Sequence, residues 1–281
     1  MKLLNFYFEG KKHLGALKEG RIIELTVFNK TEDLLAKGEE GLEEAYKALE
    51  KEEISFEEKD FELLPPLTEP QKIICIGLNY YSHCEEQNAK IPEHPIIFSK
   101  FINTLTASGQ PIIKPFITEK LDYEAELAVV IGRKGKRITR QDALSYIAGY
   151  MNFNDVSARD IQFGERQWVR GKTLDTFAPI GPYLVTADEI KDPQKLSIKC
   201  WVNDELRQDS TTEEMIFDIP YLIEFVSQAI TLYPGDIIAT GTPKGVGAFR
   251  NPPAFLKGGD TVKIEIENLG VLENTVAEEV F

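Results

Sequence analysis

The sequence predicts a β-rich α+β fold, and three features of its patterning support this prediction. Strand-like apolar runs, such as those at 72–77 and 260–267, recur along the chain between turns that contain proline or glycine. Such runs are typical of strands. The helical patterns are fewer, and they do not alternate regularly with the strands. Because a doubly wound parallel sheet needs that alternation, we expect a mainly antiparallel or mixed sheet.

Residues 1–70 are predicted to form a small accessory domain with both strands and a helix. Residues 1–30 resemble short strands and turns, and residues 32–62 carry 13 acidic side chains against four lysines. Apolar side chains recur at helical intervals within the acidic stretch, which predicts an exposed amphipathic helix at 39–52. Three prolines between residues 65 and 70 form a stiff connector, so we place the domain boundary there.

The larger domain, residues 71–281, is predicted to consist mostly of strands. Two segments favour helices: 139–150, which opens with Thr139 and Asp142 in capping-box positions, and 213–232, which a proline interrupts. We expect strands at 72–77, 95–101, 110–114, 126–132, 150–156, 180–185, 198–204, 235–241 and 260–267.

The composition excludes several classes of protein. A net charge of −14 over 281 residues argues against nucleic acid as a partner, which would require a basic face. We expect no membrane span, and Glu9 follows the start too closely for a secretory signal, so we expect a cytoplasmic protein. The cysteines at 75, 84 and 200 show no CxxC spacing, which indicates neither a disulfide framework nor a zinc site.

Three carboxylates lie at the start of an apolar run that should be buried. Asp122, Glu124 and Glu126 alternate with other residues, so a strand would place them on one side, with neighbours about 6.6 Å apart. Carboxylates this close repel each other unless a cation lies between them. The alternative is a solvated strand start beside Lys114 and Lys120, and this stretch alone leaves both interpretations open.

His83 follows a strand-like run and a glycine, where a strand end can deliver side chains into a pocket. Glu86 comes three residues later, so the two side chains meet if the segment is helical. A carboxylate on an imidazole fixes its tautomer and raises its basicity, as a general base requires. A surface histidine with a chance neighbour is the alternative. Adjacent Cys84 would face another way on a helix, which argues against a cysteine nucleophile.

Asp155, at the end of another predicted strand, is a third carboxylate that could reach Glu124 and Glu126. Such an all-oxygen site suits Mg²⁺, Mn²⁺ or Ca²⁺ better than zinc. A bound ion with open positions could accept a bidentate 2-oxo acid and act as a Lewis acid on its keto oxygen.

The glycine-rich segment 240–249 is not a phosphate loop, because two prolines follow it and exclude the helix whose N-terminus would hold the phosphate. A tight turn of this kind can still bind a carboxylate through its amides and hydroxyls, although a plain turn is the simpler interpretation. The sequence contains no GxSxG, HExxH or GxxxxGK[ST] motif.

Five motifs follow one another from about residue 72 to the C-terminus: GLNYYSHCEE, DYEAELAVVIG, NDVSARDIQ, RGKTLDTFAPIGP and TGTPKGVG. In this order they resemble the fumarylacetoacetate hydrolase family, nearest its acylpyruvase-type and bacterial branches. The resemblance implies a mixed β-roll catalytic domain, a homodimer, and a divalent ion, usually Mg²⁺ or Mn²⁺.

The resemblance also implies roles for single residues. It makes His83 and Glu86 the pair that activates water, and Lys172 the cation beside a developing enolate. It makes Glu124, Glu126 and Asp155 the metal ligands, with Asp122 just outside them, and Gln162, Gly241 and Thr242 the residues that bind the substrate carboxylate.

The sequence departs from the family pattern at "FSKF", where many relatives have "FxKP", which puts a substrate role for Lys100 in doubt. Residues 82–95 resemble the family's mobile lid, which would influence the choice of substrate. Residues 1–60 carry no usable resemblance beyond that of a small accessory domain.

The leading hypothesis is a metal-dependent hydrolase that cleaves a C–C bond in a 3-acylpyruvate or a related 2,4-dioxo acid. His83 would activate water, and pyruvate enolate would leave, stabilised by the ion and Lys172. Decarboxylation of oxaloacetate and isomerase or dehydratase reactions on a 2-hydroxyhepta-2,4-diene-1,7-dioate-type substrate would use the same site. A non-catalytic Ca²⁺-binding module is the remote alternative.

Overall fold

The computed structural model describes residues 1–281 except 52–53, 57–60, 166 and 281. The strands are β1 Lys2–Phe8, β2 Lys11–Lys18, β3 Arg21–Glu24, β4 Ser55–Phe56, β5 Glu62–Leu64, β6 Ile73–Gly77, β7 Ile96–Lys100, β8 Leu105–Ala107, β9 Ile112–Lys114, β10 Leu121–Asp122, β11 Ala125–Ile131, β12 Ile147–Asn154, β13 Ser157–Ala158, β14 Ala178–Thr186, β15 Ser197–Val202, β16 Glu205–Thr211, β17 Ile237–Ala239, β18 Thr261–Ile266 and β19 Val271–Glu278. The α-helices are α1 Thr31–Ala36, α2 Glu39–Lys51, α3 Tyr81–Glu86, α4 Arg159–Gly164, α5 Val169–Lys172 and α6 Ile219–Ala229.

The strands form one large mixed sheet and two smaller sheets. The large sheet has the order β4-β3-β2-β1-β14-β12-β11-β17-β6-β7, with β5 added to β1 and β8 to β14. A five-stranded sheet has the order β16-β15-β18-β19-β9, and β10 pairs with β13. Each of the nine predicted strand segments contains a strand, and the β-rich mixed architecture agrees with the predicted fold class.

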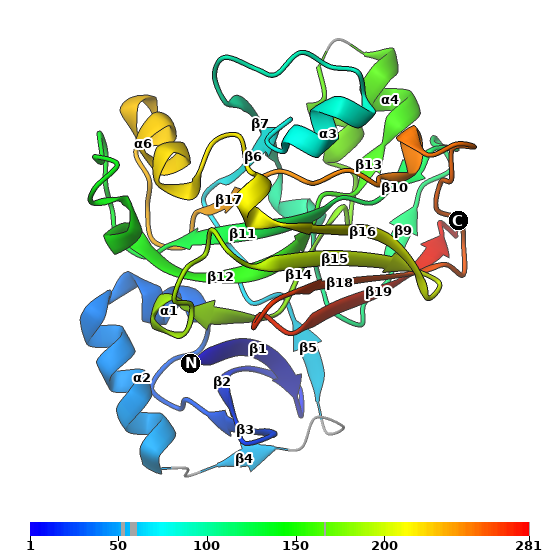
Figure 1. The fold of residues 1–281 in the computed structure, drawn as a ribbon. Helices are drawn as coiled ribbons and strands as arrows, with labels where there is room; N and C mark the ends of the chain where they lie inside the picture. Colours follow the sequence, from blue (N-terminus) through cyan, green and yellow to red (C-terminus); the bar gives the residue numbers. More distant parts are fainter. Residues whose placement is uncertain (52–53, 57–60, 166, 281) are drawn as a thin grey trace.

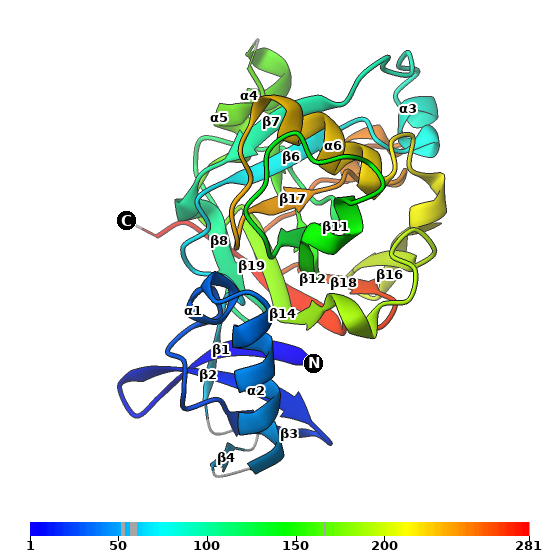
Figure 2. The ribbon, with the colours of Figure 1, turned by 90° about the vertical axis from the view of Figure 1, so that its left-hand side faces the viewer.

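The N-terminal strands and α2 form the lower part of the molecule in Figures 1 and 2, while the other strands and helices lie above them. The predicted acidic helix at 39–52 is α2 as far as Lys51, and residue 52 lies outside the described residues. Helix α2 buries Ala45 and turns its charged side outward. The two parts share a sheet, because β1 pairs with β14. The boundary near residue 70 therefore separates segments of one continuous sheet. The division into domains at 1–70 and 71–281 stays a prediction.

The helix expected at 139–150 does not form. A short 3-10 turn, Ala143–Tyr146, leads directly into β12, although the Thr139 hydroxyl still donates to Asp142 at 2.8 Å. The capping contact is therefore present without an α-helix. The segment from Ile147 onward pairs with β11 on one side and β14 on the other, and this strand pairing overrides the local helical pattern.

The helix expected at 213–232 is confirmed over a shorter range. Asp218 caps α6 by accepting a hydrogen bond from the Tyr221 amide at 2.9 Å. Pro220 lies in the first turn, where a missing amide hydrogen costs nothing, so the proline starts the helix and does not interrupt it.

Strand β11 positions the acidic segment, because it is buried on both faces. Leu127 and Val129 belong to one apolar core, while Ala128 and Val130 belong to the core on the opposite face. Such a strand has no solvated side. The carboxylates at its start are therefore held inside the molecule, and the solvated strand start considered from the sequence is wrong.

Candidate metal centre and active site

Glu124, Glu126 and Asp155 meet where β11 begins and β12 ends. Antiparallel pairing sets Glu126 opposite Phe153, and the Asp155 amide donates to the Glu124 carbonyl at 2.9 Å. One carboxylate oxygen from each of the three acids lies within 4.8 Å of the others. All three side chains are buried. The structure therefore brings together the three acids that the sequence singled out.

Two lysines and an arginine surround these carboxylates. The Nζ of Lys172 lies 2.7 Å from Glu124 and 2.8 Å from Asp155. The Nζ of Lys100 lies 2.5 Å from the other oxygen of Asp155. Arg159 contacts Glu124 at 2.7 Å and Asp122 at 2.8 Å. Asp122 thus forms an ion pair with Arg159 and lies outside the cluster of three acids.

Glu126 is the carboxylate for which the described residues supply no cation contact. Its Oε2 accepts a hydrogen bond from the Gly241 amide at 3.0 Å. Burial, together with the neighbouring carboxylates of Asp155 and Glu124, raises the pKa of Glu126 well above its ordinary value. Burial alone would also raise the pKa of Glu124, but Lys172 and Arg159 outweigh it and lower that pKa. Since a buried charge needs compensation, the three oxygens and the uncompensated Glu126 fit a divalent cation.

His83 and Glu86 lie on α3, near this cluster. The Nδ1 of His83 is 2.6 Å from Glu86, and the second oxygen of Glu86 accepts from the Gly245 amide at 2.8 Å. The predicted helical contact is therefore formed, and the glycine-rich segment anchors it. The ring of Phe249 packs against His83 at 6.2 Å between centroids. His83 is buried, so the surface-histidine alternative is wrong.

Lys172 is the last residue of α5, which packs closely against α4. A side chain at Gly171 would approach the Gln162 amide nitrogen to 2.7 Å and its Cα to 2.9 Å. Only glycine lets the two short helices come this close. The close approach holds Lys172 against the carboxylates.

The residues expected to bind a substrate carboxylate are placed differently from one another. Gln162 and Thr242 line the cavity described below, with Gln162 accepting from Arg159 at 2.9 Å and Thr242 accepting from Gln208 at 2.8 Å. The amide of Gly241 instead points to Glu126. In this structure Gly241 therefore supports a carboxylate of the cluster.

Comparison with known proteins shows the same family along most of the chain. Residues 72–277 match the family described as fumarylacetoacetate (FAA) hydrolase, C-terminal. The chain belongs to the fumarylacetoacetate hydrolase family. A protein of Xenopus laevis named oxaloacetate tautomerase fahd2, mitochondrial, is 47% identical over 264 residues, which are 92% of this chain and 83% of that protein.

Solved structures of the family have the same fold. The fumarylacetoacetate hydrolase of Exiguobacterium antarcticum is 34% identical, with a TM-score of 0.88 over 99% of this chain and 100% of that one. The maleylpyruvate hydrolase of Sphingobium sp. SYK-6, solved with manganese(II) and pyruvate, is 30% identical, with a TM-score of 0.84 over 100% of both chains. The predicted family fold is therefore confirmed, and the protein is an enzyme of a family that acts on small acids. The non-catalytic Ca²⁺-binding alternative is wrong.

In this family member Glu124, Glu126, His83 and Lys172 line one small cavity of about 50 Å³, and Asp155 lies next to the two glutamates. Aromatic rings form part of its wall. The lining residues are Ile76, Gly77, Leu78, His83, Gln87, Phe98, Glu124, Glu126, Arg159, Gln162, Phe163, Trp168, Lys172 and Thr242.

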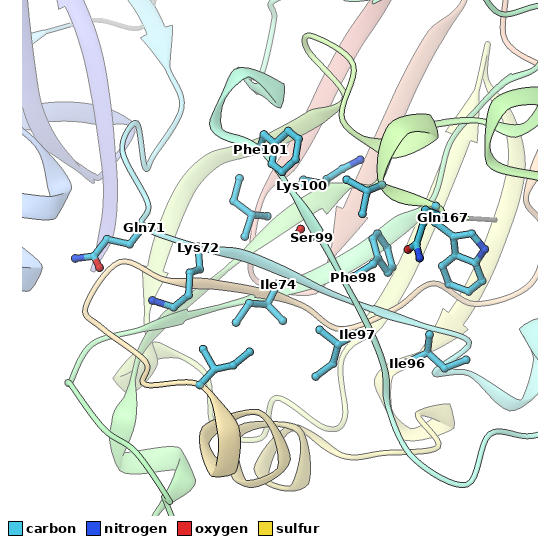
Figure 3. Close-up of a pocket in the computed structure, with 14 residues that line it drawn as sticks. Gln71, Lys72, Ile74, Ile96, Ile97, Phe98, Ser99, Lys100, Phe101 and Gln167 are labelled. Carbon is cyan, nitrogen blue, oxygen red and sulfur yellow. The ribbon is translucent and has the colours of Figure 1, made fainter. Parts of the chain in front are cut away.

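A larger groove of about 690 Å³ lies along β6 and β7 (Figure 3). Phe98, Trp168 and Lys100 line it, and the first two also line the small cavity. It contains none of the three acids, so we assign the chemistry to the small cavity. Figure 3 shows Lys100 on β7 next to Phe101, at the end of the groove.

Sequence reasoning missed three residues of the site. Arg159 is 98% buried, and its Nη2 has no hydrogen-bond partner among the described residues. Its position four residues after Asp155 was the available signal. Lys100 was left in doubt, and it lies fully buried against Asp155. Gln87, whose Nε2 lies 2.6 Å from Nε2 of His83, gave no signal beyond its place in the lid segment.

Among the helices of the described chain, none combines the length and the apolar character that crossing a bilayer requires. The three cysteines are buried and free.

Proposed function

We propose that this protein is a divalent-metal-dependent enzyme that interconverts the keto and enol forms of a small 2-oxo dicarboxylic acid, with oxaloacetate as the leading substrate. The observation that carries the proposal is one small cavity lined by His83, Glu124, Glu126 and Lys172. Glu86 contacts His83, and Asp155 completes the cluster of three acids. The name of the Xenopus laevis relative supports this choice of reaction.

We propose Glu124, Glu126 and Asp155 as the metal ligands and Mg²⁺ or Mn²⁺ as the ion. The bound ion would act as a Lewis acid on the 2-oxo group. The manganese in the maleylpyruvate hydrolase structure supports a divalent ion in this chain as well. Ca²⁺ would suit the same oxygen ligands.

His83 would carry the proton. On enolisation the C3–H bond of the substrate would break and its proton would pass to His83. The imidazolium would then release that proton, directly or through solvent, to the 2-oxo oxygen, so no atom is gained or lost. Glu86 stabilises the imidazolium that forms in between. Lys172 would donate to the oxygen that gains negative charge. Arg159 lines the cavity, and its unpartnered Nη2 would donate to a substrate carboxylate oxygen.

Hydrolysis of a 3-acylpyruvate is the second candidate, favoured by the contact between His83 and Glu86, because the same pair could take a proton from water. Decarboxylation of oxaloacetate, and isomerase or dehydratase chemistry, would draw on the same metal and Lys172.

One set of measurements separates these reactions. Purified protein with Mg²⁺ or Mn²⁺ would be supplied with oxaloacetate and with an acylpyruvate, and enol absorbance, pyruvate release and carbon dioxide release would be followed. Faster enol–keto exchange than hydrolysis or decarboxylation is the expected result, and no acceleration of the exchange would refute the proposal.

We also propose a homodimer. Strand β7 is the edge of the large sheet, and apolar side chains near it are exposed: Ile97, Phe101 and Ile102. An exposed apolar edge strand is a surface that a second copy could cover. Light scattering at micromolar concentration should give twice the 31.8 kDa of one chain, and the mass of one chain would contradict the proposal.

The cytoplasmic location expected from the sequence stays a prediction, since the Xenopus laevis relative is named mitochondrial.

A further inference from the structure

Both ring nitrogens of His83 are occupied in this structure. Glu86 lies 2.6 Å from Nδ1, and the side-chain nitrogen of Gln87 lies 2.6 Å from Nε2. A carboxylate accepts hydrogen bonds only, so the proton of the neutral ring belongs on Nδ1. The lone pair of the ring then lies on Nε2, where the Gln87 amide donates to it. The nitrogen that should take a proton is therefore capped.

Gln87, the residue that caps Nε2 of His83, is part of the cavity wall. Gln87 lines the cavity together with His83 and Arg159. Hydrogen bonds hold the backbone around it: Gln87 ends α3, and the next two amides, of Asn88 and Ala89, donate to the carbonyls of Glu85 and Cys84 at 3.0 and 2.9 Å. Its half-buried side chain is held by the contact with His83. The amide can therefore leave Nε2 by side-chain rotation alone.

A substrate must remove this cap before His83 can act. An ionised carboxylate is a stronger acceptor for an amide N–H than a neutral imidazole nitrogen, because charged acceptors make hydrogen bonds about twice as strong. In a four-carbon 2-oxo dicarboxylic acid, the distal carboxylate is bonded to C3, the carbon that loses its proton. A carboxylate placed there would draw the Gln87 amide away from Nε2 and leave the freed base next to C3.

We propose that Gln87 recognises the distal carboxylate of the substrate and, in doing so, uncaps His83, so that the enzyme favours 2-oxo dicarboxylic acids over 2-oxo acids with a neutral distal group. The inference rests on the proposed function for the identity of the reaction. It makes Gln87 a specificity-determining residue that acts partly through His83. A 2-oxo acid with a neutral distal group gains nothing from displacing the amide and meets a capped base.

The kinetic test compares oxaloacetate with its 4-methyl ester, which keeps the 2-oxo acid end and neutralises the distal group. Full-length protein with saturating Mg²⁺ would be used, and keto–enol exchange would be followed by ultraviolet absorbance. We expect Gln87→Leu to lower the ratio of kcat/KM for oxaloacetate to that for the ester by about tenfold or more. The change should appear as a higher KM for oxaloacetate and a higher kcat for the ester. Gln141→Leu is the matched control, since Gln141 is an exposed glutamine outside the cavity and outside residues 82–95, and its ratio should stay unchanged.

A binding test does not depend on turnover. The chain has three histidines, so the ring nitrogens of His83 can be followed by ¹⁵N NMR of histidine-labelled protein with Mg²⁺. Malate, a four-carbon dicarboxylate, should shift the Nε2 signal of His83, whereas 2-hydroxybutyrate, with a methyl group in place of the distal carboxylate, should leave it unchanged. In Gln87→Leu the two ligands should give the same signal.

The outcomes separate this inference from the proposed function. An unchanged substrate ratio in an active Gln87→Leu enzyme would overturn the role of Gln87 and would leave Arg159 as the group that binds the distal carboxylate. A wild-type enzyme that exchanges neither substrate would overturn the proposed function. In that case the ¹⁵N comparison still decides whether Gln87 senses a distal carboxylate.

Discussion

The Nζ of Lys100 lies 2.5 Å from Oδ1 of Asp155, and neither side chain is exposed to solvent. Lys100 also donates to the carbonyls of Val156 and Lys172. It thus contacts the oxygen of Asp155 that Lys172 does not contact, and it supports the candidate metal centre. Burial lowers the pKa of Lys100, whereas Asp155 acts in the opposite direction.

Lys100→Met should therefore destabilise the protein, although it touches no part of the proposed substrate position. Among the described residues, Lys100 is one of the two lysines that contact the buried Asp155, and Lys172 alone would remain. Removing one partner of a buried ion pair typically costs about 3–5 kcal/mol. Urea denaturation would measure the free energy of unfolding. Lys90→Met, which breaks an exposed pair, is the control and should change it by at most about 1 kcal/mol. Equal effects of the two substitutions would contradict this account.

Removal of the metal should abolish activity. We expect EDTA to stop turnover and Mg²⁺ or Mn²⁺ to restore it. Glu126→Ala should lose both metal binding, measured by titration calorimetry, and activity, because it removes one of three carboxylates from the site. Full activity of thoroughly metal-free protein would show that the acids serve another purpose.

Glu86→Gln should separate reactions that need a proton carrier from those that do not. The substitution keeps the size of the side chain but removes the charge that stabilises the imidazolium of His83. Keto–enol exchange and acylpyruvate hydrolysis should slow by up to about 100- to 10,000-fold. Decarboxylation of oxaloacetate should persist, and Lys172→Ala should depress all three. A uniform loss in Glu86→Gln would instead mean that the pair mainly orders α3.

Gly171→Ala should reduce activity by displacing α5 and Lys172 from the carboxylates. The added methyl group would lie 2.7 Å from the Gln162 amide nitrogen. We expect a destabilisation of about 1–3 kcal/mol, typical of overpacking, together with a lower kcat. Gly164→Ala is the matched control on α4, since nothing lies within 4 Å of a side chain added there. Thermal unfolding and steady-state kinetics of the two variants would decide the matter.

Asp160 should make a pH-dependent contribution to stability. Burial would raise its pKa, but the hydrogen bonds from the Thr118 hydroxyl and from the Glu119 and Ile161 amides outweigh burial and lower it. A folded-state pKa below the unfolded value of 3.8 means that the contribution is present above that value and is lost as the pH falls through the folded-state pKa. Asp160→Asn should therefore be less stable than the wild type near pH 7. The difference should shrink in acid, as urea titrations at several pH values would reveal.

The sequence allowed the chemistry of the site to be predicted better than its surroundings. The period of a strand put Glu124 and Glu126 on one side, and helical spacing put Glu86 beside His83, because both relations are local. The same period also put Asp122 in the row. Its ion pair with Arg159, which lies 37 residues away in the sequence, depends on the pairing of β10 with β13.

Features that depend on contacts between distant segments could not be predicted. The burial of Lys100 depends on the position of Asp155 and on the carbonyl of Lys172, 72 residues further along the chain. The local pattern at 139–150 favoured a helix, and pairing with β11 and β14 decided otherwise. Gln87 looked like an ordinary polar residue at a helix end, and only the direction of its side chain connects it to His83.

The pairing of β1 with β14 has a consequence for any attempt to produce the catalytic part alone. Leu3 and Leu14 share an apolar core with Ile180 and Leu184. A chain that starts after the prolines would therefore leave unpaired the backbone groups of β14 that pair with β1, and it would expose an apolar surface beside them. Neighbouring chains could add to that edge one after another. The N-terminal segment therefore protects the edge of β14 and the apolar surface beside it. A protein that lacks this segment should aggregate and be recovered from inclusion bodies.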